Sequence, residues 1–259
     1  MSNFKNIWIV GDIHGNWLPV RSFYGQHKKE LSKDYKENLL ILLGDVGANF
    51  YLDNTDKKFK KKLSTLPFTY FCIRGNHEER PSVLAKNNPT EWNKIEQFEN
   101  FVWVENAYPK ILYALDEGGE YNINNHSVLI APGAYSIDKL YRIFYNYPWF
   151  PGEQLDKNEQ NNILNSLKPH YDFIFSHTCP ISWHTYISDL FLKSVDQSKV
   201  DMSMEKFLEQ IAQNTSWNHW YFGHYHKDRD LPTNATMLFQ TAIPLGKNYS
   251  EYFNSQLTF

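Results

Sequence analysis

Cysteine is scarce in this sequence, with only Cys72 and Cys179 among 259 residues. Both stand in or beside apolar stretches that are typical of strands, so we expect two reduced, buried thiols. Pairs of clustered thiolates, which structural zinc sites use, are therefore absent. The low cysteine content argues against a disulfide-rich secreted scaffold and favours a cytoplasmic protein.

Long hydrophobic runs are also lacking. No apolar stretch approaches the roughly 20 residues that a membrane-spanning helix needs. A signal peptide has a basic segment followed by an apolar segment, and neither precedes the apolar run at 7–11. We therefore expect no signal peptide. The sequence predicts a protein without a membrane partner.

A large excess of charge of either sign is missing, because the formal net charge is −3. Bulk charge therefore gives no support to a nucleic-acid partner. The one basic run, KKFKKK at 57–62, can be read as a nucleic-acid contact. We favour a helix with solvent-facing lysines whose Phe59, Leu63 and Leu66 pack inward, because no other basic cluster matches it.

Short apolar runs, in contrast, are plentiful and predict strands. They cover residues 7–11, 39–44, 68–73, 101–104, 111–115, 126–131, 172–176, 219–223 and 236–240. Helix-length segments separate many of them, including 153–167 and a stretch with apolar Met204, Phe207, Leu208 and Ile211 at helical spacing.

The order of these segments predicts one α/β domain over residues 1–259. Strands and helices alternate in the first third, which favours parallel strands with crossover connections. Residues 101–131 hold strands close together, which favours an antiparallel portion with a hairpin turn at Asn124-Asn125. No linker or internal repeat divides the chain.

Polar side chains follow five of the predicted strands. The segments are Gly11-Asp12-Ile13-His14, Gly44-Asp45, Gly75-Asn76-His77, His177 and Gly223-His224-Tyr225-His226. Each alone fits an ordinary turn or a satisfied histidine. Their recurrence at strand ends is specific, because parallel strands bring their carboxyl ends to one edge of a sheet.

These residue types fit together as metal ligands. Two carboxylates, an amide and several imidazoles suit Mn, Fe, Zn, Co or Ni better than Ca or Mg alone. They are numerous enough for two ions. We therefore expect two divalent metals, and among the candidate metals we favour manganese. A pair of metals can hold a phosphoryl group and generate a hydroxide nucleophile near neutral pH.

The ordered set D-x-H, G-D, G-N-H, H and G-H-x-H resembles the calcineurin-like metallophosphoesterase superfamily over roughly residues 7 to 240. The resemblance implies two facing mixed β-sheets flanked by helices, a four-layer α/β/β/α sandwich. It implies a first metal on Asp12, His14 and His226, and a second on Asn76, His177 and His224. Asp45 would bridge the two metals, and His77 would act as general acid or stabilise charge on the phosphate.

Two details bear on the subfamily. Protein Ser/Thr phosphatases of this superfamily read GDxVDRG at the second motif, whereas Ala48 and Asn49 replace that Asp and Arg here. Arg74 before the GNHE motif is retained, and we assign it to substrate binding. Glu78 and Glu79 are expected to cap the first turn of the next helix.

An aromatic-rich loop at 134–153 resembles bacterial and phage-type members of the superfamily. In one interpretation it forms a wall of the substrate site, where Tyr135 stacks on the substrate and Arg142 meets a phosphate oxygen. In the other, the aromatic rings pack on the sheet and Asp138 pairs with Arg142. Both interpretations stay open at this point.

The sequence predicts a metal-dependent phosphoesterase that hydrolyses phosphate monoesters, such as a phosphoprotein, a nucleotide or a small ester. The first alternative is a phosphodiesterase or nuclease, which the lack of a basic groove disfavours. The second is a non-enzymatic scaffold, which the complete set of ligand positions disfavours. The oligomeric state stays open.

Overall fold

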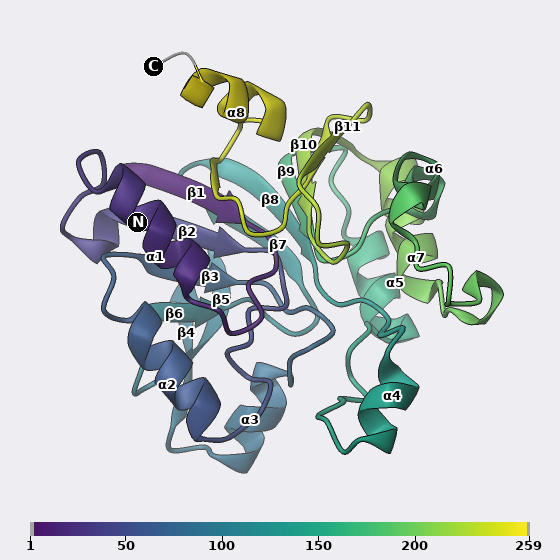
Figure 1. The fold of residues 1–259 in the computed structure, drawn as a ribbon, viewed down its shortest axis with the longest axis horizontal. Coiled ribbons are helices and arrows are strands. Elements are labelled where there is room, and N and C mark those ends of the chain that lie inside the picture. Colours follow the sequence, from purple (N-terminus) through teal and green to yellow (C-terminus); the bar gives the residue numbers. More distant parts are fainter. Residues whose placement is uncertain (1–2, 258–259) are drawn as a thin grey trace.

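The protein, seen in a computed structural model that describes residues 3–257, contains two facing β-sheets with helices on their outer sides (Figure 1). The strands are β1 (Asn6–Val10), β2 (Asn38–Leu42), β3 (Thr69–Cys72), β4 (Trp92–Gln97), β5 (Asn100–Glu105), β6 (Ile111–Tyr113), β7 (Gly119–Ile123), β8 (His126–Ala131), β9 (His170–Ser176), β10 (Ser216–Phe222), β11 (Arg229–Leu231), β12 (Ala235–Met237) and β13 (Ile243–Pro244). The helices are α1 (Leu18–His27), α2 (Asn54–Leu63), α3 (Pro81–Asn87), α4 (Lys139–Phe144), α5 (Lys157–Asn165), α6 (His184–Ile187), α7 (Ser203–Asn214) and α8 (Tyr249–Leu257).

Both sheets are mixed. The seven-stranded sheet has the order β13-β1-β2-β3-β6-β5-β4 and is parallel from β1 to β6. The six-stranded sheet has the order β11-β12-β10-β9-β8-β7 and is parallel from β12 to β8. The predicted sandwich of two mixed sheets, with parallel strands first and antiparallel strands in the middle, is confirmed.

Side-chain alternation along the strands builds three hydrophobic layers. Leu39 and Ile41 of β2 point into the core between the sheets, where they join Phe175 of β9. Leu40 and Leu42 point the other way, into the layer beneath α1 and α2. A third layer packs α7 and α5 on the six-stranded sheet. Because both faces of the central strands are covered, these strands read as continuous apolar runs in the sequence.

The structure differs from the sequence prediction at several elements. β4 was missed because it is an exposed edge strand with a polar sequence, and β7 because only two of its residues are buried. Residues 139–144 of the predicted loop form the short helix α4. The helix expected from 153 begins at Lys157, because Asp156 and Glu159 form a capping box at that point.

Several local predictions are confirmed. Asn124 and Asn125 form the β7–β8 turn, with φ angles of 51° and 66° that suit asparagine. Helix α7 buries Met204, Phe207, Leu208 and Ile211. Cys72 and Cys179 are free and buried. Within residues 3–257, every helix is too short or too polar to cross a membrane.

Helix α2 carries the basic run, and one of its lysines is not solvent-facing. Phe59, Leu63 and Leu66 are buried as predicted. Lys60 is buried as well, and its Nζ pairs with the carboxylate of Glu105 and lies 5.3 Å from the ring centre of Tyr108. The expectation of a uniformly solvated basic face was therefore wrong at this position.

We expect Lys60→Met to lower the free energy of unfolding by about 3–5 kcal/mol, because it leaves the buried Glu105 carboxylate without its partner. Urea unfolding followed by circular dichroism measures the change. The exposed neighbour gives a matched control, and Lys61→Met should stay within about 0.5 kcal/mol of the parent protein. The double change Lys60→Met with Glu105→Leu should recover most of the loss. A double variant as unstable as Lys60→Met would contradict the pairing.

Candidate metal centre

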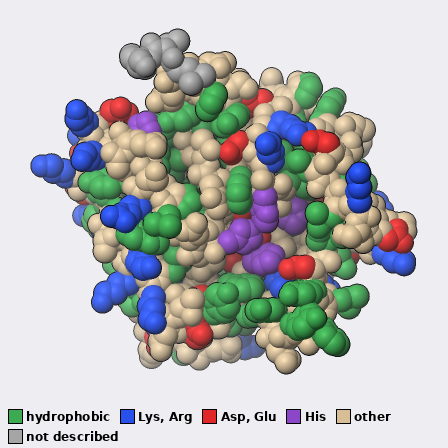
Figure 2. Space-filling model, in the orientation of Figure 1, with side chains coloured by type: hydrophobic (Ala, Val, Ile, Leu, Met, Phe, Trp, Pro, Cys, Tyr) green, Lys and Arg blue, Asp and Glu red, His purple; other side chains and the backbone are tan. Residues whose placement is uncertain are grey.

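The predicted ligands follow strands whose carboxyl ends meet at one edge of the sandwich. β1, β2 and β3 supply Asp12, His14, Asp45 and Asn76, and β9 and β10 supply His177, His224 and His226. Figure 2 shows histidines gathered in the middle of this face of the molecule. All seven side chains therefore come from loops that the parallel strand order brings together.

One group of ligands lies toward solvent. The Nε2 atoms of His14 and His226 are 2.9 Å apart, and His226 Nε2 lies 3.4 Å from Asp12 Oδ2. These three residues form a cluster whose geometry can hold one cation.

The second group is buried at Asn76 and His177 and half-buried at His224. Asn76 Oδ1 lies 2.9 Å from His177 Nε2, and the rings of His177 and His224 have centres 5.0 Å apart. Asp45 stands between the groups, with Oδ1 3.4 Å from His177 Nε2 and Oδ2 3.8 Å from His14 Nε2.

The donor chemistry of the buried group fits a metal. His177 Nδ1 lies 2.7 Å from the carbonyl oxygen of Leu43, so it carries the proton of the neutral ring and leaves a lone pair on Nε2. Asn76 donates through Nδ2 to Ser136 Oγ at 2.9 Å, which turns its Oδ1 toward that lone pair. At 2.9 Å, either a proton on Nε2 or a bound cation can join these two atoms, and a cation would take the place of that proton.

The charges of these side chains support the same interpretation. Burial raises the pKa of Asp12 well above its usual value. Burial alone would also raise the pKa of Asp45, but the charges of His177 and His77 outweigh it and hold that pKa well below its usual value. Burial alone would lower the pKa of His177, but Asp45 and Asp12 raise it to about 9. The two carboxylates thus favour a positive charge at this point, and a bound cation would supply it.

The loops that carry the ligands are tightly constrained. Asp45 and His224 have φ angles of 45° and 71°, an uncommon region for residues other than glycine. A Cβ on Gly75 would lie 2.1 Å from Asp45 Oδ1, and one on Gly223 would lie 2.3 Å from Asp12 Oδ1. Only glycine allows the backbone to approach these two carboxylates so closely.

Comparison with known proteins agrees with this geometry. The calcineurin-like phosphoesterase family matches residues 5–228, which include all seven side chains. The chain belongs to this family. A solved crystal structure aligns with 90% of this phosphoesterase and 89% of its own chain, with a TM-score of 0.51 and 15% sequence identity, and so shares the fold. A search of curated proteins gave no match.

His77 of the phosphoesterase lies beside the ligands, at the solvent side. Its backbone N–H donates to Asp45 Oδ1 at 2.9 Å. Its ring Nε2 lies 3.9 Å from Asp45 Oδ2 and 4.0 Å from Asp138 Oδ2, and the side chain is 23% exposed. Asp138 was singled out only as part of the loop at 134–153, because its closeness to His77 arises from the tertiary fold.

Glu78 does not cap a helix as expected. Helix α3 begins at Pro81, and Glu78 is buried beneath the loops of the centre. Its carboxylate accepts N–H bonds from Gly47 at 3.1 Å and Gly75 at 3.4 Å. Burial, and next the charge of Asp45, raise the pKa of Glu78 to about 8. Glu78 therefore supports the loops that carry Asp45 and Asn76.

The three residues assigned to substrate binding differ in position. Tyr135 lines a cavity over the centre. Arg74 is buried and donates to the carbonyl oxygen of Glu153 at 2.7 Å. Arg142 is buried behind Asn76, and its Nε lies 3.2 Å from Asp138 Oδ1, the paired alternative described above. Neither arginine lines the cavity, so their contact with substrate stays a prediction.

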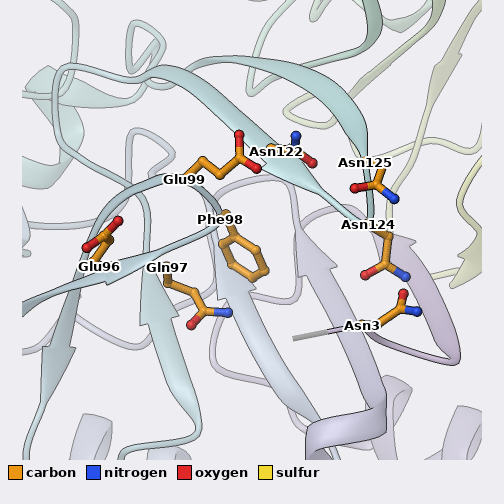
Figure 3. A pocket seen from close by; sticks show the side chains of 8 residues that line it. All are labelled: Asn3, Glu96, Gln97, Phe98, Glu99, Asn122, Asn124 and Asn125. Atoms are coloured by element: carbon orange, nitrogen blue, oxygen red, sulfur yellow. The ribbon is translucent and has the colours of Figure 1, made fainter. Parts of the chain in front are cut away.

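The cavities large enough for a ligand include three that differ in their position relative to the centre. One of about 450 Å³ lies over the centre and includes His77, Asp138 and His224. A second of about 450 Å³ adjoins His14 and His77 on the side of α2. The third, of about 500 Å³, lies between the β4–β5 and β7–β8 turns and is lined by asparagine, glutamine, glutamate and Phe98 (Figure 3). It contains none of the predicted ligands.

Proposed function

We propose that this phosphoesterase is a phosphatase with two divalent metals that hydrolyses phosphate monoesters. The observation that supports it most directly is the meeting of two ligand groups on either side of Asp45. Asp12, His14 and His226 would hold one ion, and Asn76, His177 and His224 the other. The bound metals would supply Lewis-acid chemistry, lowering the pKa of water and polarising the phosphoryl oxygens. Manganese suits this mixed oxygen and nitrogen donor set.

Residues of the chain would position the substrate and donate a proton or a hydrogen bond to the phosphate ester. His77 is tied to Asp45 through its backbone, so its ring has a fixed place beside the ligands. From there it would donate a proton or a hydrogen bond to an oxygen of the phosphate ester. Asp138, 4.0 Å from the ring, would help to orient it.

The cavity over the centre supports a small ester rather than a nucleic acid. None of the described residues that line it is a lysine or an arginine, so it offers no cationic track for a phosphate backbone. The two free, buried cysteines agree with the cytoplasmic location that we predict.

A phosphodiesterase is the second candidate, and one observation favours it. The cavity on the side of α2 is lined by Phe50, Tyr51, Lys58 and Lys62, next to His14 and His77. A diester carries two organic groups, and this cavity could receive the second one.

Hydrolysis of p-nitrophenyl phosphate and of bis-p-nitrophenyl phosphate by the manganese-loaded protein separates the candidates. We expect the monoester to have the larger kcat/KM and EDTA to abolish its hydrolysis. A preference for the diester would overturn the monoesterase proposal in favour of the second candidate. Metal-bound protein inactive on both substrates would count against either activity.

A further inference from the structure

The cavity over the centre has an apolar wall that metal binding does not require. Ile137 contributes to it from one side, and the segment between α6 and α7 contributes from the other. The apolar members of the lining are Ile137, Leu190, Phe191, Leu192, Val200 and Met202. Apolar side chains of this kind offer neither strong hydrogen bonds nor charge to a ligand.

The charged groups in the same lining are acidic or are histidines. Asp138 and Glu205 face the cavity together with the ligand histidines. Arg142, a buried arginine that contacts Asn76, already lies against Asp138. A second anionic group, away from the metals that would hold the phosphate, would therefore lose water and meet carboxylates without a lysine or arginine to compensate.

The apolar surface continues outside the cavity. Ile137 leads directly into α4, where Leu140 and Phe144 are among the most exposed large apolar side chains of the described chain. Figure 2 shows apolar side chains beside and below the histidines, at the place that α4 occupies in Figure 1. An apolar group that fills the cavity can thus extend over α4 without entering water completely.

From these observations we infer that the phosphoesterase selects monoesters whose leaving group is an uncharged, apolar alcohol, in preference to nucleotides and other polyanionic esters. This inference rests on the proposed function, since it names the substrate class of the same centre. The metals would hold the phosphate, and the apolar wall would hold the organic part. Burial of each added methylene group would then strengthen binding.

A homologous series of n-butyl, n-hexyl and n-octyl phosphate tests the inference, because chain length changes apolar area but hardly changes the leaving-group alcohol. We expect kcat/KM to rise about two- to fourfold per methylene. The bisphosphate of 1,6-hexanediol should be on the order of tenfold poorer than n-hexyl phosphate, because its second phosphate enters the acidic cavity.

Leu192→Asp should flatten the chain-length dependence, because it places a carboxylate in the apolar wall. Leu18→Asp is the matched control: Leu18 is 54% exposed against 56% for Leu192, and it lies outside this cavity. The control should keep the slope of the parent protein. An equal loss of slope in both variants would contradict a role for the wall.

The outcomes distinguish the inference from the function on which it rests. A flat series, or a preference for the bisphosphate or AMP while p-nitrophenyl phosphate is still hydrolysed, would overturn the inference and leave the phosphatase in place. If no ester is hydrolysed, the phosphatase proposal fails, and calorimetry with n-butyl- and n-octylphosphonate decides the rest. Tighter binding of the octyl compound would support the apolar wall, and equal or no binding would overturn it.

Discussion

Asp45→Asn is expected to remove metal and activity together. The Asp45 carboxylate reaches into both ligand groups, with Oδ1 3.4 Å from His177 Nε2 and Oδ2 3.8 Å from His14 Nε2. Asparagine keeps the shape but has no charge, and its nitrogen is a poor ligand. The loss in metal affinity should exceed the roughly 10–100-fold that removal of a partner outside the ligand shell costs.

The substitution should leave the fold intact. Asparagine tolerates the left-handed backbone that residue 45 adopts, and its Oδ1 can still accept the N–H of His77. Loss of metal would therefore not be a consequence of unfolding. Thermal unfolding of the metal-free protein, parent and variant, checks this point.

Metal content by plasma emission spectroscopy after gel filtration, together with turnover of p-nitrophenyl phosphate, gives the measurement. The parent protein should retain two ions per chain, and the variant should fall toward one or none. Asp34→Asn is the control, since the Asp34 side chain accepts a backbone N–H from Lys36 just before β2 and belongs to neither ligand group. A variant with two ions and full activity would refute the place of Asp45 between the metals.

The strands of the parallel core could be predicted from the sequence because both of their faces are buried. Leu39 to Leu42 form an apolar run for this reason, and the polar residues after such runs stand out. β4 is the opposite case. Four of its six residues are exposed, so its place in the sheet depends on pairing with β5, which no local pattern reveals.

The residues of the centre also differ in how well local sequence signals predict their positions. The positions of the seven ligand candidates follow from strand ends and glycines, which are local signals. The positions of Arg74 and Arg142 do not follow from such signals, because the side chain of an arginine beside a motif can point into a cavity or into the protein interior. Here the carbonyl of Glu153, which only the tertiary fold brings close, engages Arg74. The carboxylate of Asp138, one helical turn earlier in the chain, engages Arg142, which is the local pairing that the sequence left open.

His77→Ala is expected to lower kcat by about 10²–10⁴ while both metals stay bound, because His77 is proposed to donate to the phosphate ester and not to bind a metal. The geometry also allows another role, since His14, Asp45 and His77 are close enough to hold an ion themselves. Metal content of the variant separates the two. His126→Ala, a change at an exposed histidine in β8, should alter neither metal content nor kcat.

A comparison of two esters with different leaving groups then distinguishes proton donation by His77 from stabilisation of charge on the phosphate. A general acid matters most when the departing oxygen is strongly basic, so its loss should slow phenyl phosphate more than p-nitrophenyl phosphate. A hydrogen bond to a non-bridging phosphate oxygen acts on both esters alike. We expect unequal losses in His77→Ala, with phenyl phosphate the more affected. Equal losses would assign His77 to the phosphate oxygens, and loss of an ion would place it among the ligands.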